Sequence, residues 1–122
     1  MKLSQLKVKE FKQLSIKLLP LLKKITGDKQ LKEAMFRPVP IKMGMTELEI
    51  KQVKSEYKIN KIYEVIELLL EKHDETFYNI LAILNDVTPQ EVEEWTLSQL
   101  VESIVNILED EGFLRLFTLA AK

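Results

Sequence analysis

Apolar residues recur at every third or fourth position along most of the chain, which is the period of an α-helix. The first such row consists of Phe11, Leu14, Leu18, Leu21 or Leu22, and Ile25. Pro20 lies inside this row and cannot donate a backbone hydrogen bond to the carbonyl of Ile16, so we expect a kink or a break there. Gly27 and Asp28 close the segment, and residues 29–36 predict a further short helical stretch.

Residues 37–45, with the sequence RPVPIKMGM, predict a loop. Two prolines at alternate positions favour an extended backbone, and Gly44 adds conformational freedom. The loop separates two packed segments of one domain, because residues 1–36 are too few to bury a core by themselves.

A long helix is predicted for residues 46–72. Thr46 and Glu49 have the spacing of a capping box, in which each side chain bonds the backbone amide of the other residue. The segment is polar at first and then densely apolar, and we expect the apolar part to lie in the middle of the domain. Its apolar residues are Ile59, Ile62, Tyr63, Val65, Ile66, Leu68, Leu69 and Leu70.

Three more helix starts follow. Asp74 or a neighbour should cap a helix that carries Phe77, Ile80, Leu81 and Leu84 on one side. Thr88 begins a second capping-box pattern, with Pro89 at the first helical position, where its missing amide costs nothing. Thr96 begins a third, with Trp95 placed to pack on Leu100 as a hydrophobic staple.

The last of these helices is expected to end at Gly112. It should bury Leu97, Leu100, Val101, Ile104 and Leu108. The predicted core of the whole domain comprises Ile66, Leu69, Phe77, Leu81, Leu84, Leu100, Val101 and Ile104. The sequence thus predicts an all-α fold, a single-domain bundle of five to seven helices over residues 1–122.

The end of the chain is unusually apolar. We predict that Phe113, Leu114, Leu116 and Phe117 form a partner-binding surface on a segment that starts afresh after Gly112. The alternative is that this segment folds back onto the domain.

The two halves of the chain carry opposite charge. Residues 1–61 hold 15 Lys or Arg against 6 Asp or Glu, a balance of +9, and residues 62–122 hold 3 against 13, a balance of −10, which gives the net charge of −1. The halves could neutralise each other within the monomer, or one charged face could remain open for a partner or for self-association.

Candidate catalytic chemistry is sparse. The chain has one histidine and no cysteine, and His73 lies at a helix junction, where a solvated or capping role is expected. The acidic clusters at residues 91–94 and 109–111 are explained by helix ends. We therefore expect no enzyme activity and no catalytic, cofactor-binding or metal-binding residues. The apolar runs are too short to span a bilayer, and a cytoplasmic location is the default.

The lysine-rich first half makes a small nucleic-acid-associated or regulatory protein the alternative. Lysine contacts phosphate, but base readout favours arginine, and the first half has fourteen lysines and one arginine, Arg37. The lysines of the first helix also lie at every phase of the helix rather than on one stripe. Nucleic-acid binding is therefore the less favoured interpretation.

The stretch from about Tyr57 to Leu108 contains the sequences KHDETFYNILAILN and DVTPQEVEEWTLSQLVESIVNIL. It resembles the tail assembly chaperones of long-tailed bacteriophages and prophages of Gram-positive hosts. The shared phrase of apolar and capping residues lies between Leu84 and Gln99, with Trp95 where an aliphatic residue is more usual. The opening LKVKEFKQL is similar as well, and the resemblance covers half to two thirds of the chain.

This resemblance implies a non-enzymatic role. Such proteins coat the helical tape-measure protein before the tail tube polymerises, keep it soluble, help to recruit the tail tube protein, and are absent from the finished virion. Many are made in two lengths by a programmed frameshift. The family has no catalytic residues to transfer to this chain.

Overall fold

The computed structural model describes residues 3–121 and, within them, leaves the side chain of Ser4 aside; residues 1–2 and 122 lie outside the described part. The described residues form helices joined by short connections, with no strand among them. The elements are a 3-10 turn η1 (Leu3–Gln5) and the helices α1 (Val8–Thr26), α2 (Lys29–Phe36), α3 (Glu47–Lys72), α4 (Asp74–Asn85), α5 (Pro89–Glu93), α6 (Leu97–Glu109) and α7 (Glu111–Ala120). The predicted all-α class and helix number are confirmed.

Helix starts agree closely with the capping residues of the sequence. Thr46 and Thr96 each form a complete capping box, with Glu49 and Gln99 respectively. Thr88 caps α5 through the amide of Glu91, and Pro89 takes the first helical position. Of the expected caps for α4, Asp74 or a neighbour, it is the neighbour His73 that occupies the N-cap position, and it makes no side-chain capping bond.

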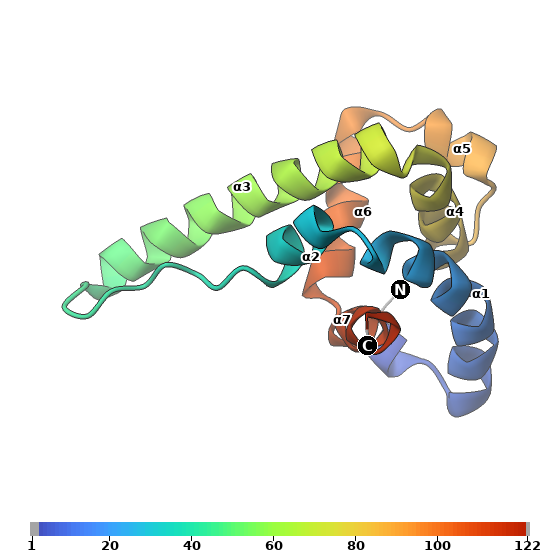
Figure 1. Cartoon of the computed structure of the whole chain (residues 1–122), viewed down its shortest axis with the longest axis horizontal. Coiled ribbons are helices and arrows are strands. Elements are labelled where there is room, and N and C mark those ends of the chain that lie inside the picture. The colour runs from blue at the N-terminus through green and yellow to red at the C-terminus, as the bar shows by residue number, and fades with distance from the viewer. Residues whose placement is uncertain (1–2, 122) are drawn as a thin grey trace.

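Helix α1 continues through Pro20, so of the expected alternatives, a kink or a break, the break does not occur. Its ribbon changes direction along its length (Figure 1). Pro20 and Ile16 both lie on the exposed side of α1. The Ile16 carbonyl, which loses its helical donor at Pro20, can therefore be solvated rather than stranded in the core.

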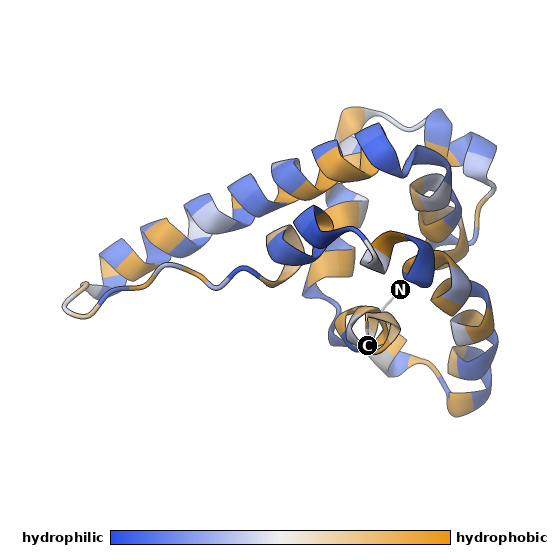
Figure 2. Ribbon diagram, in the orientation of Figure 1, coloured by the Kyte–Doolittle hydropathy of each residue, from blue (hydrophilic) through white to orange (hydrophobic). Residues whose placement is uncertain are grey.

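The core lies where α1 packs against α4 and α7, and where the inner half of α3 packs against α2, α4 and α6. Six of the eight predicted core residues are buried, and Leu100 and Val101 are partly buried against them. Leu97 was expected inside, but it is 69% exposed in the first turn of α6. Hydrophobic residues accordingly concentrate where the helices converge (Figure 2).

The apolar part of α3 lies largely inside, as expected, with Ile62, Ile66 and Leu69 buried, but Ile59 and Tyr63 are exposed. The outer half of α3 projects from the rest of the molecule, and the extended segment 37–46 runs along it (Figure 1). We call residues 37–60 the arm, and the rest of the described chain the body.

Candidate partner-binding surface

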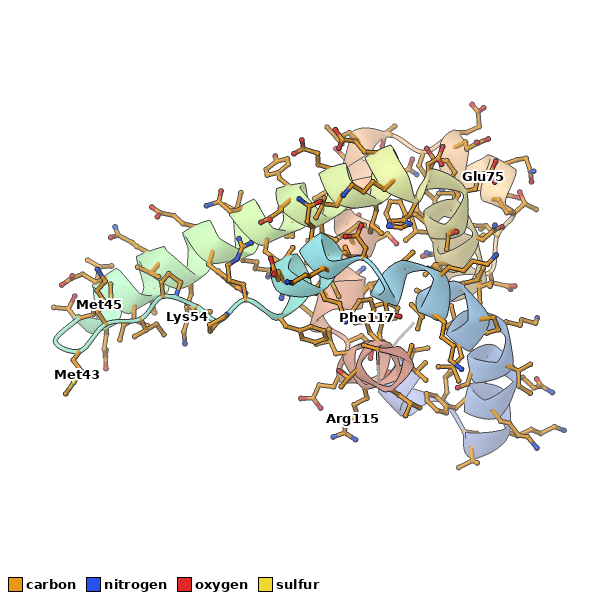
Figure 3. The ribbon with its side chains drawn as sticks, viewed as in Figure 1. Met43, Met45, Lys54, Glu75, Arg115 and Phe117 are labelled. Atoms are coloured by element: carbon orange, nitrogen blue, oxygen red, sulfur yellow. The ribbon has the colours of Figure 1, made fainter. Side chains whose placement is uncertain are left out.

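The C-terminal segment is part of the core, which corrects the expected partner-binding surface. Phe113, Leu116 and Phe117 are buried, and Leu114 is partly buried against the same cluster. The ring centroid of Phe117 lies 5.5 Å from that of Phe36 on α2 and 6.4 Å from that of Phe113. Figure 3 shows Phe117 directed inward from α7 and Arg115 directed away from the body. The alternative, in which the segment folds back onto the domain, is the arrangement observed.

Asp110, not Gly112, separates α6 from α7, so the expected glycine stop is wrong. One carboxylate oxygen of Asp110 accepts from the Gly112 amide at 2.9 Å and caps α7. The other accepts from the Leu3 amide at 2.7 Å, which fastens the 3-10 turn to the C-terminal helix. This buried carboxylate is therefore occupied by structural hydrogen bonds.

His73 lies between α3 and α4, as expected, and its Nε2 is 3.0 Å from the Asp28 Oδ2. Asp28 also accepts from the amides of Gln30 and Leu31, at 3.0 and 3.2 Å, and so caps α2. The hydrogen bond with His73, followed by the two amide bonds and the charge of Lys72, lowers the pKa of Asp28. This cluster joins two helix junctions that are distant in sequence.

Among residues 3–121, no group of three or more His, Cys, Asp or Glu side chains is arranged to hold a metal ion. An apolar cavity of ≈ 40 Å³ lies in the core, and its lining includes Met35, Val65, Phe77 and Phe117. A cavity with an apolar lining offers water no hydrogen-bond partners. It is a packing defect of the core rather than a polar binding site.

The arm carries several exposed apolar side chains near its tip in the sequence. Met43 at its tip is fully exposed, and Ile41 and Leu48 beside it are exposed as well. Gly44 forms the turn with a φ of +86°, a conformation that favours glycine. Figure 3 shows Met43 projecting beyond the end of α3, with Lys54 further along the arm.

Polar contacts join Arg37, the first residue of the arm, to the middle of α3. The Arg37 guanidinium donates to both carboxylate oxygens of Glu64, at 2.9 and 3.1 Å, and Glu64 raises the pKa of Arg37. The Tyr57 hydroxyl donates to the Arg37 carbonyl. Partial burial lowers the pKa of Lys61, whose Nζ lies 5.7 Å from the centroid of the Tyr57 ring. These contacts join the beginning of the extended segment to α3.

The sequence predicted residues 37–45 as a loop but not the projection of the arm from the body. The signals present in the sequence are the two prolines of the loop and a following helix that is polar before it becomes apolar. Periodicity does not show which half of a helix has a neighbour.

Opposite charges meet within the monomer at few points of the described chain. Ion pairs between the two halves join Arg37 to Glu64, Lys58 to Glu109 and Lys72 to Asp28. The first two pairs are solvent-exposed, and such pairs contribute little to stability. Internal neutralisation therefore involves only a small part of the charged side chains described.

In residues 3–121, no helix combines the length and the apolar content needed to cross a membrane. Comparison of the chain with protein-family models, with curated proteins and with solved structures gives no match. A function is therefore proposed below from the sequence and from the surface of the molecule.

Proposed function

We propose that this chain is a non-enzymatic tail assembly chaperone, which binds the helical tape-measure protein of a long-tailed bacteriophage or prophage and keeps it soluble during tail assembly. On this proposal it acts in the cytoplasm of the bacterial host, helps to recruit the tail tube protein, and is absent from the finished virion. The resemblance between Leu84 and Gln99 motivates the assignment.

The observation that carries the proposal is the arm. It combines exposed apolar side chains with exposed charges on a projecting helix, to which Arg37 at the base of the arm is hydrogen-bonded. Exposed apolar groups of this kind are typical of surfaces that bind other proteins. A helix is also a suitable surface for another helix, because apolar rows on both can pack against each other.

Co-expression tests the proposal. The chain should be produced together with the long helical protein encoded in the same gene cluster, and that protein should shift from the insoluble to the soluble fraction and co-purify with the chain. Equal amounts of insoluble tape-measure protein with and without the chain would refute the proposal. Finding the chain in purified virions would refute its assignment as an assembly factor that leaves the tail.

A nucleic-acid-associated or regulatory role remains the second candidate, because Lys51, Lys54 and Lys58 lie exposed along one side of the arm. Lysines contact phosphate groups, and binding through them weakens steeply as salt increases. Retention on duplex DNA that is lost with rising salt, without any effect on the tape-measure protein, would favour this role instead.

A further inference from the structure

One side of α3 carries a seven-residue repeat that extends from the arm into the body. The positions alternate by four and three residues and are Leu48, Gln52, Ser55, Ile59, Ile62, Ile66 and Leu69. The last three are buried in the body. On the arm, Leu48 is 67% exposed and Ile59 is 54% exposed. We call the four outer positions, from 48 to 59, the seam.

The opposite side of the outer helix is already covered. Val53 and Tyr57 are half-buried and line, together with Arg37 and Pro40, the small depression between the extended segment and α3. The bond from the Tyr57 hydroxyl to the Arg37 carbonyl fastens this side. Segment 37–46 therefore covers one side of the arm helix and leaves the seam, on the opposite side, exposed to solvent.

The seam has a charged edge of each sign. Lys51 and Lys58 lie along one edge, and Glu49 and Glu56 lie along the other, all of them exposed. Lys58 also forms the ion pair with Glu109, and Glu49 also closes the capping box with Thr46, so the selection of a partner depends mainly on Lys51 and Glu56. In paired helices the positions that flank the apolar row face the partner's flanking positions, so their charges select the partner and its direction.

We propose that the seam binds one amphipathic helix of another protein, with an apolar row flanked by acidic residues on one edge and basic residues on the other. The inference rests on the proposed function, since it names the surface and the kind of client segment used. Leu48 and Ile59 are eleven residues apart, which is about 16 Å at the helical rise of 1.5 Å per residue. The polar Gln52 and Ser55 between them keep the contact weak and reversible.

A second copy of the chain fits the seam poorly in either direction. In a parallel pair the two bodies would collide, because the seam continues inward to Ile62 and Ile66, where α6 packs against α3. In an antiparallel pair, Lys51 of one copy would face Lys58 of the other, with the glutamates similarly opposed, and like charges repel. A free-standing helix has neither difficulty.

Three synthetic peptides of equal length test the charge pattern. Each peptide is a short helix with the same row of leucines and with alanine at the remaining positions, and each is used at a concentration at which it is monomeric. The positions that flank the leucine row carry glutamate on one side and lysine on the other in the first peptide (mixed flanks), glutamate on both sides in the second, and lysine on both sides in the third. The full-length protein should bind the mixed-flank peptide about ten-fold more tightly than either of the others at low salt, as expected for a small number of complementary charge contacts. Equal affinity for all three, or no binding, would overturn the proposal.

Two variants locate the contact. Lys51→Glu leaves the Lys58–Glu109 pair in place and makes the outer part of the basic edge acidic, so the preference should shift from the mixed-flank peptide toward the all-lysine peptide. Lys12→Glu, at an exposed position of α1, is the matched control and should leave the preference unchanged. Leu48→Glu with Ile59→Glu should weaken binding of the mixed-flank peptide at least about ten-fold, whereas Ile16→Glu, at an exposed apolar position of α1, should not.

The remaining outcomes separate this surface from the proposed function. All variants change exposed residues, so each must retain the helical circular dichroism and urea midpoint of the parent. Wild-type preference for the all-glutamate peptide, with duplex DNA binding lost in the lysine variant, would overturn the proposal in favour of a phosphate-binding edge. A dimer lost in the Leu48 and Ile59 variant would overturn it in favour of a second copy. If the Leu48 and Ile59 variant still solubilises the tape-measure protein, the seam is not the binding surface, although the proposed function stands. If the peptides bind as expected but the tape-measure protein is not solubilised, the seam is supported as a helix-binding surface and the tape-measure protein is rejected as its client.

Discussion

Truncation of Phe117 to alanine tests directly whether the C-terminal segment belongs to the core. Phe117 is 1% exposed and packs on Phe36 and Phe113. Removing a buried phenylalanine ring typically costs about 3–5 kcal/mol in the free energy of unfolding. The upper part of this range is expected, because two aromatic contacts are lost and Phe117 already borders the apolar cavity, which the truncation would enlarge.

A loss of this size is a large fraction of the roughly 5–15 kcal/mol that stabilises a typical domain. Urea denaturation, followed by circular dichroism at about 222 nm, measures this loss of stability as a lower midpoint with an unchanged slope. Leu119→Ala is the matched control in the same helix, since Leu119 is 57% exposed, and should change the stability by less than about 0.5 kcal/mol. Equal effects of the two substitutions would refute the placement of α7 in the core.

Four further measurements follow from the structure. Asp28→Asn should destabilise the protein at neutral pH. The pKa of Asp28 is lowered from its ordinary value of 3.8, so the charged carboxylate stabilises the fold above that pH, and this stabilisation is lost as the pH falls through the lower folded-state pKa. The urea midpoints of the two proteins should therefore converge in acid. Val65→Ile should fill part of the core cavity and raise the free energy of unfolding by up to about 0.8 kcal/mol for the added methylene; a clear loss would mean that the cavity cannot accept it. Thr96→Ala should cost about 1 kcal/mol in the free energy of unfolding of the whole protein, whereas Thr46→Ala should mainly reduce amide-exchange protection in the arm. Equal losses of global stability in the two variants would contradict the expectation that the arm can open locally while the body stays folded. Light scattering should detect weak self-association at low salt that disappears at high salt, because exposed charges are screened; a monomer at both salt concentrations and at high protein concentration would reject it.

Local signals in the sequence were sufficient for the helices themselves. Capping depends on residues three positions apart, so Thr46, Thr88 and Thr96 each marked a helix start that the structure confirms. Periodicity likewise identified most of the core, because a row of apolar residues on one side of a helix usually faces the interior. The acidic cluster at residues 109–111 was placed correctly at a helix end, but Asp110 rather than Gly112 makes the junction.

Tertiary structure decided which apolar rows obtain a neighbour. Phe117 and Leu97 are both large and apolar, yet the first is buried and the second is 69% exposed, because α2 covers one and no packed element covers the other among the described residues. The same holds within α3: one repeat is buried at Ile62 and Ile66 and open at Leu48 and Ile59. The spacing of apolar residues in the sequence determines that a helix has an apolar row on one side. Whether that row becomes core or surface depends on which distant segments fold against it, because burial requires contacts between residues far apart in the chain.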